Sequence, residues 1–109
     1  MAKTKPLPPI DNLMQKIKDC LDIGAYKQTV HALKRRAERD IDLLDALYVL
    51  KNGYHEKSKT SFDEAFQAWK YAVRGKTLDE LDIRIIVAFD ESGMLIITVM
   101  HVAKKEDGK

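Results

Sequence analysis

Three side chains whose chemistry suits a phosphate group follow one another at helical spacing. His31, Arg35 and Arg39 are each four residues apart, which places them in one lengthwise strip of an α-helix. Arginine offers phosphate oxygens a planar fork of donors, and histidine changes its charge near neutral pH. The strip is therefore suited to hold a phosphate and to move a proton beside it. A surface helix whose arginines pair with nearby carboxylates has the same spacing.

A second group of residues alternates cations with aromatic rings. Lys70 and Arg74 alternate with Trp69 and Tyr71, so in a β-strand the cations and the rings project from opposite faces. Cations close to stacking rings are typical of proteins that bind single-stranded RNA. Filling the hydrophobic core is the other interpretation of a lone tryptophan.

Two further polar residues lie in apolar surroundings. Arg84 falls within the apolar segment 83–89, so its charge must reach solvent, a carboxylate or a ligand. His101 ends the last apolar segment and is a candidate to face a cleft, although a histidine at the end of a strand often has only a structural role. Both are retained as candidate site residues.

Composition narrows the chemistry. The chain has 109 residues, a net charge of +2 and a single cysteine, Cys20, so we expect one domain without an internal disulfide or a cysteine-bound zinc ion. There is no glycine-rich phosphate loop, no nucleophile elbow and no pair of histidines at metal-ligand spacing. We therefore expect no cofactor, and chemistry that depends on neither a metal ion nor a nucleotide. Proton transfer with cationic stabilisation remains.

Charge and hydropathy indicate a protein without a membrane segment. The longest strongly apolar run, 94–100, is far shorter than the roughly 20 residues that span a bilayer. The first residues lack the apolar stretch of a secretory signal, so the expected location is the cytoplasm. Basic residues gather in 27–39 and 70–76 and acidic residues in 40–45 and 79–82, which predicts an uneven field over a nearly neutral molecule.

Apolar periodicity predicts the elements. Helices are expected over 10–24, ending at Gly24, over 29–40, and over 43–52, where Asp42 is the N-cap and Asn52-Gly53 a left-handed C-cap. Alternation predicts strands over 69–74, 81–89 and 94–102, the last in the centre of the sheet. Residues 62–68 fit either a short helix or a strand.

The predicted fold is α+β, with three N-terminal helices packed on an antiparallel sheet of three to four strands. The domain is expected over 10–103. A flexible N-terminal segment over 1–9 precedes it, and a charged C-terminal tail over 104–109 follows.

Several motifs resemble a bacterial family of unknown function, the domain-of-unknown-function 4258 family, over about residues 13–102. They are His31-Ala32-Leu33-Lys34-Arg35-Arg36-Ala37-Glu38-Arg39, then Leu50-Lys51-Asn52-Gly53, Trp69-Lys70-Tyr71, the apolar run 83–87 and Ile96-Ile97-Thr98-Val99. The order of elements is also distantly similar to toxins of the RelE and MqsR type. These small two-layer sandwiches cut messenger RNA and are silenced by an antitoxin.

The resemblance implies a toxin-like protein that cleaves RNA without a metal ion or acts on the ribosome. The resemblance selects His31, Arg35 and Arg39, with Trp69 and Tyr71 as weaker members. Together with the residues singled out above, the expected catalytic residues are His31, Arg35, Arg39, Lys70 and Arg84, and the expected substrate-binding residues are Trp69, Tyr71, Arg74 and His101. Arg35 and Arg39 would hold the phosphate, His31 would act as acid or base, and Lys70 or Arg84 would neutralise developing charge. Expected partners are RNA, an antitoxin protein or a second copy of the chain, and no membrane. The alternatives are a non-catalytic module that binds protein or RNA and a dimeric structural domain.

Overall fold

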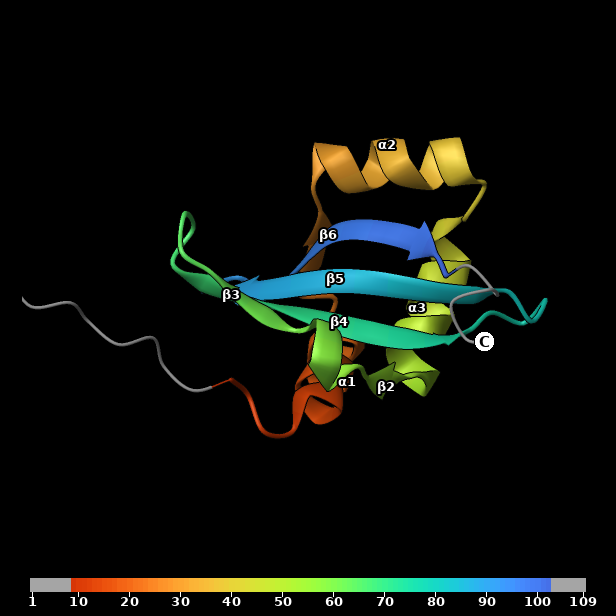
Figure 1. Cartoon of the computed structure of the whole chain (residues 1–109). Helices are drawn as coiled ribbons and strands as arrows, with labels where there is room; N and C mark the ends of the chain where they lie inside the picture. The colour runs from red at the N-terminus through yellow and green to blue at the C-terminus, as the bar shows by residue number, and fades with distance from the viewer. Residues whose placement is uncertain (1–8, 103–109) are drawn as a thin grey trace, which may run out of the picture.

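The computed structural model describes residues 9–102, which form three α-helices, a short 3₁₀ helix and a six-stranded mixed sheet (Figure 1). Along the chain the elements are α1 (Leu13–Asp22), β1 (Tyr26–Gln28), α2 (Val30–Arg39), α3 (Leu43–Asn52), β2 (Tyr54–His55), η1 (Lys57–Lys59), β3 (Ser61–Asp63), β4 (Ala68–Lys76), β5 (Asp82–Asp90) and β6 (Gly93–His101).

The three long strands make the centre of the sheet. The strand order is β1-β6-β5-β4-β2, and β3 continues the β2 edge by pairing with the first half of β4. All neighbours are antiparallel except β1 and β6, which run parallel. The prediction that the last strand lies centrally is confirmed only for its first part, because β6 has β5 along one side and β1 on the other side over residues 94–96 alone.

Helices α1 and α3 cover one face of the sheet (Figure 1). Alternate residues of β5 point toward them, and Ile83, Ile85 and Val87 are completely buried there. From the helices, Leu13, Ile17, Val49 and Leu50 complete this core. Burial of these apolar side chains is the main stabilising contribution, at about 2 kcal/mol for each large one.

Helix α2 lies beside β6 instead of over the core, and only Ala32 of this helix is buried. β1 pairs only with residues 94–96 of β6, so α2 closes the rest of that edge. The Thr29 hydroxyl donates to the Ile97 carbonyl at 3.1 Å, and Arg39 donates from Nη1 to the Val99 carbonyl at 2.7 Å. Unpaired edges invite pairing with other chains, and these side chains protect this one.

The helix ends agree with the sequence at most positions. Asp42 caps α3 by accepting from the Asp45 amide, and Gly24 takes a positive φ of 70° just after α1. The predicted left-handed C-cap at Gly53 is wrong, because its φ is −82°. Gly53 leads directly into β2, and a Cβ there would overlap the carbonyl oxygen of Arg74 on β4. Glycine is required at this position for close approach, not for handedness.

The predicted fold class needs correction. The sheet has six strands and is mixed, and β1 separates α1 from α2, so the helices do not all precede the strands. The missed strands are two or three residues long, which is too short to show an alternating pattern. Their pairing comes from long-range contacts with β6 and β4.

Residues 62–68 form part of a β-hairpin and not a helix. Phe62 of β3 pairs with Trp69 of β4, and the Asp63 carboxylate accepts from the Phe66 amide in the turn between them. The predicted tail over 104–109, and all but Pro9 of the predicted N-terminal segment, lie outside the described residues. Within 9–102, no helix has the length and apolar character needed to cross a membrane.

Candidate functional site

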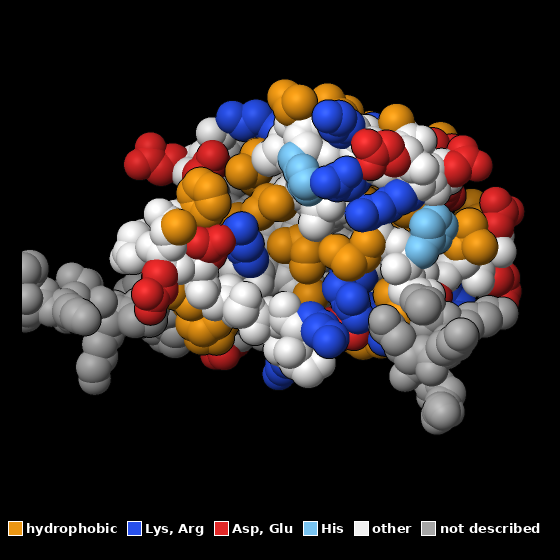
Figure 2. Space-filling model, turned by 45° about the horizontal axis from the view of Figure 1, so that its top comes forward, with side chains coloured by type: hydrophobic (Ala, Val, Ile, Leu, Met, Phe, Trp, Pro, Cys, Tyr) orange, Lys and Arg blue, Asp and Glu red, His pale blue; other side chains and the backbone are white. Residues whose placement is uncertain are grey.

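Among residues 9–102, no α-helix covers one face of the sheet, and several of the predicted site residues lie on this face or at its β6 edge. The side chains of β4, β5 and β6 that point away from α1 and α3 form this face, which we call the open face. Apolar residues make its floor, namely Ile86, Ala88, Leu95, Ile97 and Met100. Figure 2 shows lysine and arginine side chains around a hydrophobic band, with α2 along one border.

Part of the floor is hollowed. A depression of about 280 Å³ lies between Phe66, Lys70, Leu95 and Ile97. The Lys70 ammonium stands 5.0 Å above the centre of the Phe66 ring and forms an ion pair with Asp63 at 2.7 Å. Lys70 therefore places a cation at the rim of an apolar hollow.

Helix α2 directs the predicted strip toward the open face. Arg36, on the adjacent side of the helix, donates to the Gln28 side chain at 2.8 Å and to the Ile41 carbonyl at 3.2 Å, which are on the core side. His31, Arg35 and Arg39 therefore border the other side, where Arg39 reaches the backbone of β6. Helical spacing extends the strip from Arg39 to Arg35 and His31 along α2.

The three residues of the strip differ in what they contact. Arg39 holds α2 on β6 through the Val99 carbonyl. Arg35 donates to Glu38 at 2.6 Å on the surface, and this hydrogen bond holds the pKa of Glu38 below its usual value. The His31 side chain is exposed and forms no hydrogen bond or ion pair with any residue of 9–102. Within the described residues, His31 is therefore the residue of the strip whose ring nitrogens have no hydrogen-bond partner.

A charge network that the sequence did not predict crosses the open face between β4 and β5. Glu56 accepts from Arg84 Nε at 2.6 Å and from Arg74 Nη1 at 3.2 Å, and Arg74 also forms an ion pair with Asp82 at 2.7 Å. The hydrogen bond from Arg84, helped by Arg74, lowers the pKa of Glu56, and the hydrogen bond from Arg74 lowers the pKa of Asp82. The sequence predicted that the charge of Arg84 needs solvent, a carboxylate or a ligand. It did not identify Glu56 as that carboxylate, because no local sequence pattern marks Glu56.

Glu56 and His31 do not form an acid-base pair. Glu56 follows β2 at the β4 side of the sheet, whereas His31 lies on α2 beside β6, with β5 between the two. Adjacent strands are about 4.8 Å apart, so the two groups are separated by more than the roughly 3 Å of direct proton transfer.

The remaining predicted residues lie elsewhere. Trp69 and Tyr71 point to the helix-covered side, where Trp69 packs edge-on against Phe62 and the buried Tyr71 hydroxyl accepts from the Ile10 amide at 3.1 Å. His101 is exposed at the end of β6 and bonds through Nε2 to the Arg39 carbonyl at 2.8 Å. The sheet therefore carries Lys70, Arg74 and Arg84 on the open face and Trp69 and Tyr71 on the opposite side. Arg39 contacts the β6 edge of the sheet, and His31 and Arg35 lie on the same helix as Arg39.

Comparison with known families matches residues 29–101 to the model described as "Domain of unknown function (DUF4258)". The chain belongs to this family. The DUF4258 match begins at Thr29, the N-cap of α2, and ends with β6, so it contains the whole open face and its α2 border. Helix α1 and strand β1 lie before it. The match gives no link to RelE or MqsR toxins, and no curated protein matches the chain.

No group of three or more His, Cys, Asp or Glu side chains within residues 9–102 is placed to hold a metal ion. The polar groups gathered at the open face are an imidazole, an ammonium, guanidinium groups and the carboxylates paired with them. Such a set can bind a polyanion and transfer protons.

Proposed function

We propose that the open face binds single-stranded RNA and cleaves it by attack of a ribose 2′-hydroxyl on the adjacent phosphate, with His31 as the proton-transfer group. The observation that carries the proposal is an imidazole with no polar partner within residues 9–102, together with several cations, beside a sheet face that no α-helix of these residues covers. Phosphate contacts supply most nucleic-acid affinity, and an apolar floor suits unstacked bases.

Each cation has a distinct part in this proposal. Arg35 is surface-exposed and its ion pair with Glu38 is of the weak, solvent-screened kind, so a phosphate can replace Glu38 at little cost. Lys70 offers a second phosphate contact across the floor. Arg39 is a positioning residue, because its contact with the Val99 carbonyl holds the helix that carries His31.

The reaction requires one proton to leave and one to arrive. His31 takes the proton of the 2′-hydroxyl as its oxygen bonds to phosphorus, and the bond to the 5′-oxygen breaks, giving a 2′,3′-cyclic phosphate. The leaving 5′-oxygen takes a proton from water. Arg35 stabilises the negative charge that builds on the phosphate oxygens in the transition state.

Incubation of labelled single-stranded RNA with the protein in excess EDTA tests the proposal. Wild type should yield fragments that end in cyclic phosphate, and His31→Ala should lower the cleavage rate at least 100-fold. Val30→Ala, a change at an exposed neighbour on the same helix, should cleave like wild type. If wild type binds the RNA but does not cleave it, the nuclease proposal is wrong and the open face belongs to a non-catalytic binding module.

A further inference from the structure

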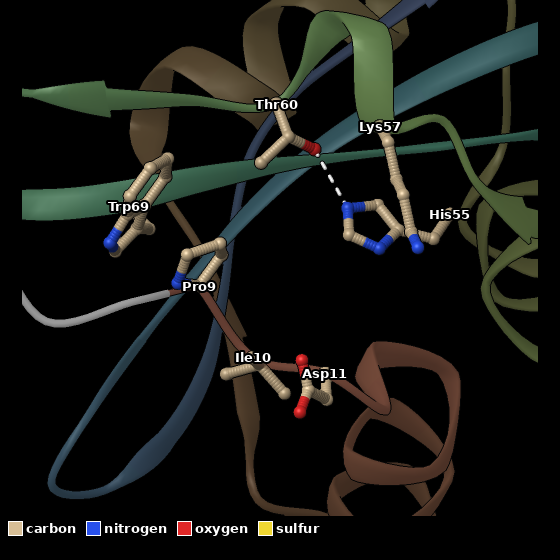
Figure 3. Close-up of a pocket in the computed structure, with 7 residues that line it drawn as sticks. All are labelled: Pro9, Ile10, Asp11, His55, Lys57, Thr60 and Trp69. Carbon is tan, nitrogen blue, oxygen red and sulfur yellow. Dashed lines mark hydrogen bonds between the residues drawn. The ribbon is translucent and has the colours of Figure 1, made fainter.

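A second hollow, of about 220 Å³, lies on the other side of β4 from Lys70. It is formed where the segment before α1 passes β2, η1 and β4, and Figure 3 shows its lining. One end is apolar, made by Trp69, Pro9 and Ile10, and the other is polar, made by His55, Lys57 and Asp11. At about 30 Å³ for each water molecule, the space suits a ligand portion the size of one nucleobase.

The apolar end presents an aromatic wall. Trp69 is braced edge-on by Phe62, with ring centres 5.5 Å apart. Stacking on an aromatic side chain is the common way to hold a nucleobase.

The polar end is held in place from behind. His55 Nε2 bonds to the Thr60 hydroxyl at 2.9 Å, and that hydroxyl also accepts from the Ala72 amide of β4 at 3.1 Å. Figure 3 shows the other ring nitrogen of His55 turned toward the hollow. Burial lowers the pKa of His55, and the charge of Lys57 adds to this effect, so the ring is neutral at physiological pH.

Two charged groups at the hollow have no partner within residues 9–102. These are the Asp11 carboxylate, which Figure 3 shows beside Ile10, and the Lys57 ammonium. A carboxylate only accepts hydrogen bonds. Among the nucleobases, guanine presents two adjacent donors, its ring N1–H and its exocyclic amino group, whereas adenine and cytosine place an acceptor beside the amino group. Lys57 is suited to a phosphate.

We infer that this hollow binds a guanine nucleotide, with the base stacked on Trp69 and paired with Asp11 and the phosphate held by Lys57. The site is separate from the open face, since Trp69 and Lys70 are neighbours on β4 that point to opposite sides. The site contains no glycine-rich phosphate loop. The expectation that the chemistry does not depend on a nucleotide was based on the lack of such a loop in the sequence, and this site would bind a nucleotide without one. The inference does not depend on the proposed RNA cleavage.

Fluorescence gives a direct test, because Trp69 is the only tryptophan. Titration of the full chain with GMP should quench its emission to saturation, and AMP should bind at least tenfold more weakly. Asp11→Asn should weaken GMP binding at least tenfold and remove the preference over AMP, because the amide turns a donor toward guanine. Asp22→Asn, at an exposed position at the far end of α1, should match wild type.

A second variant keeps the test decisive if Asp11→Asn changes the fold. Lys57→Ala should reduce binding of GMP to the level of guanosine, which lacks the phosphate. His31→Ala should leave GMP binding unchanged. No change in Trp69 emission at millimolar GMP would overturn the inference, and so would equal affinities for GMP and AMP in wild type.

Discussion

The Glu56 carboxylate shows how a single side chain can determine the state of its neighbours. It is nearly buried and accepts hydrogen bonds from both Arg74 and Arg84. Removing its charge leaves the two guanidinium groups close together, and the ion pair between Arg74 and Asp82 is retained. Breaking a buried ion pair from one side costs about 3–5 kcal/mol. Glu56→Gln should therefore lower the free energy of unfolding by about 3 kcal/mol at pH 7, as measured by urea denaturation.

The same network predicts how stability depends on pH. The pKa of Glu56 is lower in the folded protein than in the unfolded chain, where it is about 4.3, because Arg84 and Arg74 donate hydrogen bonds to it. Its contribution is fully present above that unfolded value and is lost as the pH falls through the lower folded value. The difference between wild type and Glu56→Gln should shrink in acid. A difference that stays constant between pH 7 and pH 3 would contradict this account.

Alanine substitutions at two glycines distinguish the stability cost of a steric overlap from that of a left-handed backbone conformation. At Gly24, with φ of 70°, an added Cβ meets nothing within 4 Å, whereas at Gly53 it overlaps backbone of Arg74. Gly24→Ala should cost about 1–2 kcal/mol, the price of the left-handed conformation. Gly53→Ala should cost more, about 3 kcal/mol, because backbone must move. Thermal unfolding of both variants checks the order, and the reverse order would refute it.

At the scale of elements, Thr29 connects the start of α2 to β6. Its side-chain oxygen accepts from the Ala32 amide at 2.9 Å and its hydroxyl donates to the Ile97 carbonyl at 3.1 Å. Loss of an N-cap costs about 1 kcal/mol, and an unsatisfied edge carbonyl adds to it. Thr29→Ala should lower the free energy of unfolding by about 2 kcal/mol, measured by urea denaturation.

Serine provides the matched control, since it keeps the hydroxyl. Thr29→Ser should therefore lose less than half as much stability as Thr29→Ala. If the two variants are equally destabilised, the lost methyl group and not the hydrogen bonds would explain the effect.

The elements that the sequence predicts correctly are those with their own periodicity. The helices α1 and α3 and the strands β5 and β6 repeat apolar residues over nine or ten positions, and local patterns of that length are informative. β1 and β2 have no such pattern, because a strand of two or three residues exists only through its partner. The mixed character of the sheet follows from β1 and was therefore not predictable.

At the scale of the whole molecule, the sequence placed one part of the candidate site and missed another. Helical spacing suffices to align His31, Arg35 and Arg39, and strand alternation suffices to separate Lys70 from Trp69. The sequence does not show that Arg36 turns to the core side and so directs the strip to the open face. Nor does it bring Glu56 to Arg84, 28 residues away along the chain.

The proposed binding of RNA to the open face predicts that the position of a cation, and not only its charge, determines its effect on binding. Arg35 and Lys70 flank the open face, whereas Lys18 and Lys51 are exposed on α1 and α3, which cover the opposite face. Removing either pair lowers the net charge by the same amount, so an effect of net charge alone would weaken RNA binding equally in both double variants. Only contact with phosphate distinguishes them, and each lost contact lowers both the affinity and its dependence on salt.

The most direct test of the central claim is fluorescence anisotropy of a labelled single-stranded RNA at several salt concentrations. Arg35→Ala with Lys70→Ala should weaken binding at least tenfold and flatten the salt dependence by about two phosphate contacts. Lys18→Ala with Lys51→Ala should bind almost as wild type. Equal losses in the two double variants, or no loss in the first, would contradict the assignment of RNA binding to the open face.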